Sequence, residues 1–268
     1  MSRATKASRI IEAAQAKGVR VGNAPDTFLG AGHQTARKLV DEGAIGRPVA
    51  ALCFMLSRGS ERWHPNPEMF YKAGGGPLFD FGPYYLTALL QILGPIKRVS
   101  AAAAIAIPQR TITSEPLRGK TFTVETPDHV SGAIEFANGC VATMVLSFAV
   151  MRDSFCPITI FGTEGTLRVP DPNRFDGDVT IRNGDDDEWK PVEQTYRTGY
   201  GRSVGVADMA HAIRSSRLHR ASGMQAFVVL DAMEATLESA ESGSAVDLPG
   251  GYQRPAPLPE GLPEDALD

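Results

Sequence analysis

The segment 129–149 constrains the fold most strongly, because apolar residues alternate on both sides of a central Asn-Gly pair. Alternation with a period of two is typical of strands that bury one face. A two-residue turn would pair Phe136 with Val141 and mix the two faces. A three-residue turn, with Gly139 in the left-handed conformation, pairs Phe136 with Cys140 and keeps one face apolar. The sequence therefore predicts a hairpin in this second register.

The rest of the chain alternates between helices and strands in an order that is typical of an α+β domain. Apolar residues at helical spacing predict helices over 33–42, 203–215 and 222–242, the last of them capped by Ser222. Further strands are predicted over the segments 48–56, 96–107, 155–161, 166–169, 179–182 and 190–192. The predicted fold class is α+β, with a large, mainly antiparallel sheet that helices cover on one face.

The second face of this predicted sheet is neither a dry core nor fully polar. It carries a mixture of small, polar and apolar side chains, namely His129, Ser131, Ala133, Glu135, Val141, Thr143, Val145 and Ser147. Such a face is typical of a symmetric dimer interface, and simple exposure to solvent is the alternative. We expect a homo-oligomer that forms through this open face.

The two ends of the chain differ from the central part in composition. Residues 1–24 contain a run of helix formers that ends at Gly18, followed by a short apolar segment, which predicts one helix and one strand of an α/β unit. Residues 25–249 are predicted to form the main domain. Residues 250–268, rich in proline and glycine, are predicted to form an extended, poorly ordered tail.

The glycine-rich stretch 74–85 predicts a functional site next to a helix. Three glycines allow a close backbone approach, and the apolar run that follows ends in a glycine-proline stop signal. Asp80 and Tyr84 are four residues apart, so they share one helix face and offer a carboxylate and a phenol for acid/base chemistry. Pro83 is expected either in the first turn of this helix or at a kink. The structural alternative for Asp80 is a helix that begins at Phe81, with Asp80 as its N-cap.

Charge and composition exclude several classes of function. The chain of 268 residues has a formal net charge of −4, so it lacks the basic surface expected of a protein that binds nucleic acid or a membrane surface. No apolar run reaches the length of a membrane span, and no signal core is present, so a cytoplasmic protein is expected. The three cysteines are predicted to be free thiols, and neither the histidines nor the acidic run 185–187 has the spacing of a metal site.

Five short segments occur in the order found in one family of oxidoreductases. They are Gly-Ala-Ile-Gly-Arg-Pro-Val (43–49), the glycine-rich stretch (74–85), Gly-Pro-Ile-Lys-Arg-Val (94–99), Phe-Ala-Asn-Gly (136–139) and Gly-Thr-Glu-Gly-Thr-Leu (162–167). Together they make the chain resemble the Gfo/Idh/MocA oxidoreductases, whose motif GGGxLxDxGxHxxD is similar to the glycine-rich stretch. The resemblance implies NAD- or NADP-dependent oxidation or reduction of a sugar, cyclitol or related alcohol or ketone.

The resemblance also implies roles for individual residues. Asp80 matches the catalytic aspartate of the family, and Tyr84 stands where most members have a histidine, so both are predicted to be catalytic. Trp63 and His64 precede the motif in a loop where the family places substrate contacts, although a packed indole and a surface imidazole are the alternative. Tyr200, which lies in a glycine-flanked loop, is a further candidate for binding the substrate.

By the same resemblance, residues 1–24 look like the last helix and strand of a dinucleotide-binding Rossmann domain. The glycine fingerprint that seats a pyrophosphate on a helix N-terminus and the Glu-Lys-Pro motif of the family have no counterpart in the sequence. We therefore expect an oxidoreductase-family protein that lacks most of its cofactor domain and is inactive alone. The alternative is a cofactor-free module that dimerises or binds a small molecule without catalysis.

Overall fold

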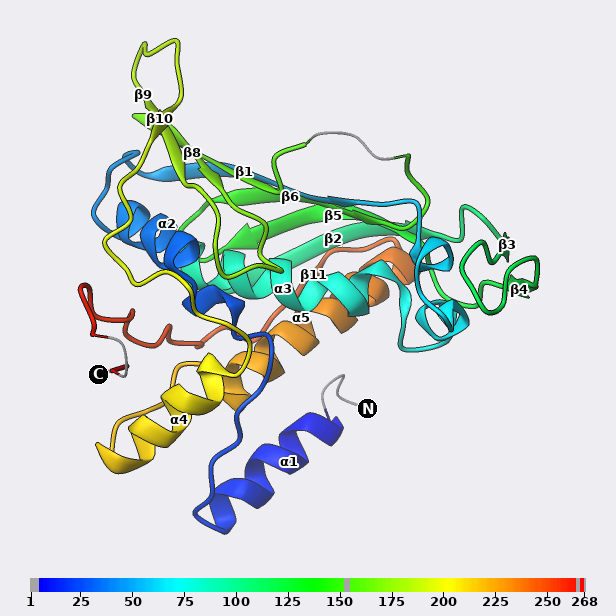
Figure 1. Cartoon of the computed structure of the whole chain (residues 1–268), viewed down its shortest axis with the longest axis horizontal. Coiled ribbons are helices and arrows are strands. Elements are labelled where there is room, and N and C mark those ends of the chain that lie inside the picture. The colour runs from blue at the N-terminus through cyan, green and yellow to red at the C-terminus, as the bar shows by residue number, and fades with distance from the viewer. Residues whose placement is uncertain (1–4, 152–154, 264–265, 268) are drawn as a thin grey trace.

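The computed structural model describes residues 5–151, 155–263 and 266–267. A layer of helices lies against one face of a long, twisted sheet (Figure 1). The helices are α1 (Thr5–Ala16), α2 (Ala31–Asp41), α3 (Gly76–Leu93), α4 (Val204–Arg214) and α5 (Gly223–Ser242), with the short 3₁₀ helices η1 (Thr27–Leu29), η2 (Ser60–Arg62) and η3 (Pro67–Tyr71). The predicted α+β class, with a large sheet and a helical layer, is confirmed.

Nine strands of the described chain form the main sheet, in the order β10-β9-β8-β7-β1-β6-β5-β2-β11. Their bounds are β1 (Pro48–Leu56), β2 (Ile96–Ala104), β5 (His129–Phe136), β6 (Val141–Ser147), β7 (Ile158–Gly162), β8 (Gly165–Val169), β9 (Thr180–Asn183), β10 (Lys190–Pro191) and β11 (Val246–Asp247). A separate hairpin is formed by β3 (Gln109–Thr111) and β4 (Thr121–Thr123), and neither strand was among those predicted from the sequence.

The sheet is mixed, because one of its pairs is parallel. Strand β1 lies between β6 and β7 and pairs in parallel with β6 and antiparallel with β7. Since β6 and β7 run in opposite directions, any strand inserted between them must be parallel to one of the two. The predicted antiparallel pairing is confirmed for the other neighbours in the sheet.

The hairpin register predicted from the sequence is confirmed. The backbone N–H of Phe136 donates to the carbonyl oxygen of Cys140 at 2.9 Å, and Gly139 has a φ of 86°. The Asn138 side chain accepts a hydrogen bond from the Cys140 N–H and donates one to the carbonyl oxygen of Leu93. The turn therefore also ties the hairpin to the end of α3, which lies on the helix side of the sheet.

The main core lies between this sheet and the two longest helices. Helix α3 contacts β1, β5 and β6, and α5 lies along β2. Leu86, Leu89 and Leu90 of α3 are completely buried against residues such as Ile134 of β5 and Leu146 of β6. Burial of each such leucine stabilises the fold by about 2 kcal/mol. The packing leaves only one side of α3 available to solvent or to a ligand.

Helix α3 begins earlier than the sequence indicated. Gly75 is its N-cap, so Asp80 lies in the second turn and the alternative of Asp80 as N-cap is wrong. Pro83 is likewise inside the helix rather than in its first turn. Gly76 has a φ of 79°, and a Cβ at this position would lie 2.7 Å from the carbonyl oxygen of Pro127. Glycine is therefore required where the helix starts.

Residues 5–24 form the predicted helix but not the predicted strand. Helix α1 lies beside α5 at the edge of the molecule (Figure 1). Residues 19–22 are extended, and Gly22 makes a single bridge to Ser222. The carbonyl oxygen of Val21 contacts Nε2 of His219 at 2.9 Å. This segment therefore joins the loop before α5 instead of extending a sheet.

The tail after residue 250 is extended, and it is packed rather than poorly ordered. The Tyr252 side chain is buried, and its hydroxyl accepts a hydrogen bond from Gln91 and donates one to Gln225. Arg254 donates to the carbonyl oxygens of Gln91 and Ile92 in the last turn of α3. These carbonyl groups have no partner within the helix, so the tail acts as its C-terminal cap.

His33 is a buried histidine in the first turns of α2. It is 2% exposed, and desolvation lowers its pKa to about 4, against the opposing effect of the neighbouring Asp171 and Arg174 backbone. The segment that covers it is close to α2, because a Cβ on Gly32 would lie 2.7 Å from the Pro170 side chain. His33 is therefore held in its neutral form at physiological pH.

We expect His33 to make the stability of the fold depend on pH. Because its folded pKa of about 4 lies below the ordinary value of 6.5, the unfolded chain takes up a proton more readily between these values. His33 should therefore destabilise the fold by about 2 kcal/mol as the pH falls from 7 to 5. Urea unfolding at both pH values should show that His33→Leu loses this part of the pH dependence.

The matched control for this experiment is His211→Leu, which removes a half-buried histidine from the last turn of α4. It should keep the wild-type difference in unfolding free energy between the two pH values. An unchanged pH dependence in His33→Leu would contradict the assignment to His33.

Candidate functional site

The first half of α3 holds the candidate acid/base pair. The apolar side of the helix packs on the sheet, and Asp80 and Tyr84 lie on a half-buried side one turn apart. Of the two adjacent phenols, Tyr85 is 3% exposed, and burial raises its pKa. Tyr85 is therefore a core residue, and Tyr84 is the phenol that a ligand can reach.

The Asp80 carboxylate is half-buried, and its oxygens are free to accept hydrogen bonds from a ligand. Desolvation raises the pKa of its carboxyl group above the ordinary value, and the nearby His64 opposes this rise. Within the described residues, no hydrogen bond or ion pair engages the carboxylate. A partly desolvated carboxylate without a partner gains strongly from a hydroxyl donor. Asp80 is thus suited to bind a hydroxyl group of a ligand.

Tyr84 is paired with Arg202, a residue that the sequence analysis missed. Nη1 of Arg202 donates to the Tyr84 hydroxyl oxygen at 3.3 Å, and the guanidinium carbon lies 5.9 Å from the ring centroid. Nη2 donates to Oδ1 of Asn173 at 3.0 Å. Because Arg202 supplies this hydrogen bond, the proton of the phenol remains available for another acceptor. The glycine-flanked loop 199–202 was the feature of the sequence that could have indicated Arg202. The sequence analysis selected Tyr200 from this loop instead.

The predicted substrate loop brings His64 towards α3 and leaves Trp63 at the rim. Trp63 is 67% exposed, and its ring centroid lies 5.3 Å from that of His64. The His64 ring is half-buried and packs edge-on against Phe70 at 4.9 Å. The carbonyl oxygen of His64 accepts a hydrogen bond from the Ser114 hydroxyl at 2.6 Å. The loop is therefore anchored by its backbone, while one aromatic face remains exposed.

Tyr200 lies in different surroundings from the other candidates. Its ring packs against a second apolar cluster that includes Phe28 and Phe175, and the guanidinium of Arg197 lies 5.2 Å from the ring centroid. Its hydroxyl group is buried without a hydrogen-bond partner in the described part of the chain. The structure brings Arg202, and not Tyr200, into contact with Tyr84. A substrate-binding role for Tyr200 stays a prediction.

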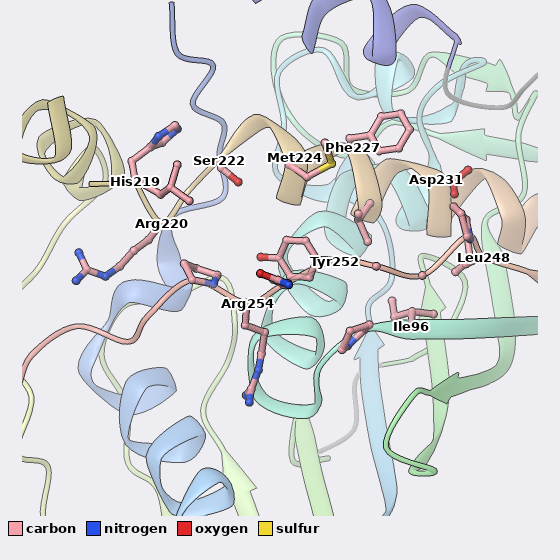
Figure 2. Close-up of a pocket in the computed structure, with 18 of the residues that line it drawn as sticks. Ile96, His219, Arg220, Ser222, Met224, Phe227, Asp231, Leu248, Tyr252 and Arg254 are labelled. Atoms are coloured by element: carbon pink, nitrogen blue, oxygen red, sulfur yellow. The ribbon is translucent and has the colours of Figure 1, made fainter. Parts of the chain in front are cut away.

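The described residues enclose several cavities, and one of them lies along the Asp80 side of α3. The first, about 780 Å³, lies between α5 and the tail, where Figure 2 shows Phe227 and Tyr252 on its walls. The second, about 300 Å³, lies between α1, α3 and α5. Pro83 and Thr87 line it, and they stand three and seven positions after Asp80, on the same helix face. A third cavity, of about 290 Å³, lies near β3.

The described residues do not fit a dinucleotide. A pyrophosphate is held by a glycine-rich turn between a parallel strand and a helix N-terminus. In the glycine-rich stretch, a Cβ on Gly75 or Gly76 would lie 2.7 Å from the carbonyl oxygen of Phe70 or Pro127, respectively. These two glycines are thus explained by contacts within the chain. The parallel pair that is described joins β1 to β6, and no glycine-rich turn of this kind connects them.

The described residues contain neither a cluster of metal-ligating side chains nor a membrane-spanning helix. No group of three or more histidine, cysteine, aspartate or glutamate side chains in that part of the chain is arranged to hold a metal ion. Nor does any described helix combine the length and the apolar character needed to cross a membrane.

The chain is similar to sugar oxidoreductases of known sequence. It is 27% identical over 253 residues to 1,5-anhydro-D-fructose reductase of Ensifer adhaerens, covering 91% of this chain and 69% of the relative. It is 24% identical over 260 residues to D-xylose dehydrogenase of Paenarthrobacter nicotinovorans, covering 87% of this chain and 65% of the relative. The chain thus spans about two thirds of the length of these relatives.

Solved structures share the fold. Levoglucosan dehydrogenase in complex with NADH and levoglucosan superposes with a TM-score of 0.74 at 24% identity, covering 92% of this chain and 70% of that one. The profile of the GFO/IDH/MocA C-terminal domain matches residues 33–168, about half of the chain, and this match includes α3 and the β5–β6 hairpin. The chain therefore belongs to the GFO/IDH/MocA family.

Proposed function

We propose that this chain is the substrate-binding and proton-handling part of an oxidoreductase that acts on a sugar, cyclitol or related alcohol or ketone. The observation that carries the proposal is the half-buried side of α3, where an unpartnered Asp80 carboxylate stands one turn from the Tyr84 phenol. The names of the relatives, a sugar reductase and a sugar dehydrogenase, support this substrate class. A cytoplasmic location is part of the proposal.

In this proposal, each candidate residue has a separate task. Asp80 accepts a hydrogen bond from a substrate hydroxyl and so orients the sugar. The Tyr84 phenol exchanges a proton with the oxygen of the reacting carbon, and Arg202 fixes the direction of that phenol. His64 and Trp63 cover the exposed side of the sugar with aromatic surface, as they stand next to one another in the anchored loop.

The cavity of about 300 Å³ beside Pro83 and Thr87 is the proposed place for part of the substrate. Its volume lies at the lower end of the range for small-molecule sites, which suits a monosaccharide. NAD or NADP is the proposed redox partner, and one structural relative is described as a complex with NADH. Because the described residues form no dinucleotide site, no step through the dinucleotide is assigned to them.

We also propose that the open face of the sheet joins two copies of the chain. Leu52 and Phe54 of β1 are half-buried on this face, and Val141 of β6 is 44% exposed. Phe155 is also exposed, and its ring centroid lies 5.4 Å from that of Phe54. Contiguous apolar side chains on a helix-free sheet face support an isologous contact with a second copy.

Sugar binding can be measured on the chain through its own fluorescence, which tests the proposed function. The chain has two tryptophans, so Trp189→Phe leaves Trp63 at the rim of the site as the reporter. Titration with D-xylose or levoglucosan should change its emission in a saturable way. Asp80→Asn should weaken this binding at least tenfold, because the substrate hydroxyl loses a charged acceptor.

Matched variants keep this test specific. Tyr84→Phe removes the hydroxyl of the half-buried phenol and should weaken sugar binding, whereas Tyr85→Phe removes a buried hydroxyl and should leave sugar binding unchanged. Asp186→Asn neutralises a half-buried carboxylate that pairs with Lys190 at the turn before β10, and it is the control for charge. No saturable emission change with either sugar, or equal losses in Asp80→Asn and Asp186→Asn, would rule out this site.

A separate prediction concerns the dinucleotide, for which the described residues form no binding site. Titration of the chain with NADH and with NADPH, followed by nicotinamide fluorescence, should show no saturation below millimolar concentration. The physical reason is that the described residues offer no glycine-rich turn at a helix N-terminus for the pyrophosphate. Micromolar binding of either dinucleotide would contradict this assignment and would show that the chain alone can hold its redox partner.

The proposed dimer makes a prediction about the open face. Val141→Lys places a charge on β6 without disturbing the core, because the side chain is exposed and Glu135 stands opposite it. We expect sedimentation velocity to show a wild-type dimer and at least tenfold weaker association in Val141→Lys. Val206→Lys is the control, since it alters an exposed valine on α4. A monomeric wild-type chain would refute the proposed interface.

A further inference from the structure

The cavity of about 290 Å³ near β3 lies outside the Asp80–Tyr84 site, and its lining contains more cationic than anionic side chains. Its walls come from three separate parts of the chain: the segment after β1, strand β3 and the segment after β6. Three arginines line it, Arg58, Arg62 and Arg110. Arg58 and Arg62 come from the segment after β1, and Arg110 comes from β3, so two distant segments bring three guanidinium groups to one small cavity.

Arg110 is fixed inside the protein by two carboxylates. Its side chain is 2% exposed, and its Nη atoms lie 2.7 Å from Glu61 and 2.7 Å from Asp128. The second oxygen of Glu61 accepts a hydrogen bond from the Tyr71 hydroxyl, and Oδ1 of Asp128 accepts one from the backbone N–H of Ala106. All four carboxylate oxygens are therefore engaged. The Nε–H of Arg110 is buried without a partner within the described residues.

Arg58 and Arg62 are not compensated in this way. Both side chains are exposed at the cavity, and within the described residues neither guanidinium has a hydrogen bond or an ion pair. The carboxylates of Glu61 and Asp128 both pair with Arg110. The three arginines and these two carboxylates together therefore have one net positive charge. Thr111 adds one exposed hydroxyl group to the lining, whereas the hydroxyl of Thr113 there donates to the carbonyl oxygen of Glu61 at 3.3 Å.

From this geometry we propose that the cavity binds a small molecule through a phosphate group. Guanidinium groups bind phosphate with paired hydrogen bonds, and the Thr111 hydroxyl can donate to a further phosphate oxygen. Two unpaired guanidiniums, Arg58 and Arg62, together with the unpaired Nε–H of a buried arginine, form a donor set that lacks only an anion. The volume admits a phosphate ion and also a small phosphate ester.

The proposed phosphate site is connected to the substrate loop through Glu61. Arg62 belongs to η2 and directly precedes Trp63, and the carbonyl oxygen of Glu61 accepts hydrogen bonds from the backbone of Thr113 and Ser114. A ligand on Arg62 therefore acts on the same turn that presents Trp63 and His64. The site does not depend on the proposed sugar chemistry, because none of its residues belongs to the Asp80–Tyr84 pair.

Isothermal titration calorimetry with inorganic phosphate at low ionic strength tests this proposal. We expect saturable binding to the wild-type chain and at least a tenfold loss of affinity in Arg58→Gln/Arg62→Gln. Because both side chains are exposed, the unfolding midpoint of this double variant should equal that of the wild type. The matched control is Arg9→Gln/Arg214→Gln, which removes the same charge from exposed positions on α1 and α4.

The possible outcomes separate a specific site from general electrostatic attraction. Retained affinity in the control supports the site, and an equal loss in the control and in Arg58→Gln/Arg62→Gln overturns it. The absence of saturable heat at tens of millimolar phosphate also overturns it. A second titration with glucose 6-phosphate identifies the source of the phosphate group. Tighter binding than phosphate assigns the site to a phosphate ester, and equal affinity assigns it to the free ion.

Discussion

The packing of α3 on β1, β5 and β6 determines where the polar residues of this helix can point. Leu86, Leu89 and Leu90 turn the apolar side of the helix to the sheet, and their burial leaves no room for it to rotate. Asp80 and Tyr84 are therefore held away from the sheet by the hydrophobic core itself. A helix that is fixed by its buried side can carry functional groups on the other side with little freedom of position.

A second constraint holds the loop that faces this helix. The buried pairs between Arg110 and the carboxylates of Glu61 and Asp128 join η2, β3 and the start of β5 into one rigid unit. Removing one member of such a network leaves an unpaired charge inside the protein, which costs about 3–5 kcal/mol. Burial and the neighbouring Glu61 raise the pKa of Tyr71, so this phenol keeps its proton and continues to donate to Glu61. The network thus maintains the turn before Trp63 by electrostatics rather than by apolar packing.

The parts of the fold that depend on local chemistry could be predicted from the sequence. The Phe136–Cys140 register follows from one buried face and a left-handed glycine, and Ser222 caps α5 through its side chain as expected. The insertion of β1 between β6 and β7 could not be predicted, because periodicity gives the faces of a strand but not its neighbours. The start of α3 was misjudged because its first turn contains residues that are poor helix formers.

In the candidate site, too, contacts between residues close in sequence could be predicted, and contacts between distant residues could not. The spacing of Asp80 and Tyr84 on one helix face is a local property, so the sequence was sufficient for it. The contact of Arg202 with Tyr84 joins residues 118 positions apart and involves an exposed side chain, for which no pattern exists in a single sequence. Composition was also misleading for the tail, where proline and glycine surround a buried Tyr252.

The position of β1 has a consequence for the order in which the chain can fold. Ala51 of this strand pairs with Ala142 on one side and with Ile160 on the other, so β1 is synthesised well before both of its partner strands. Contacts between such distant positions slow folding, because a large loop must close before they form. Until β6 and β7 are available, β1 is an apolar strand with two unpaired edges, which is the kind of segment that associates with other chains.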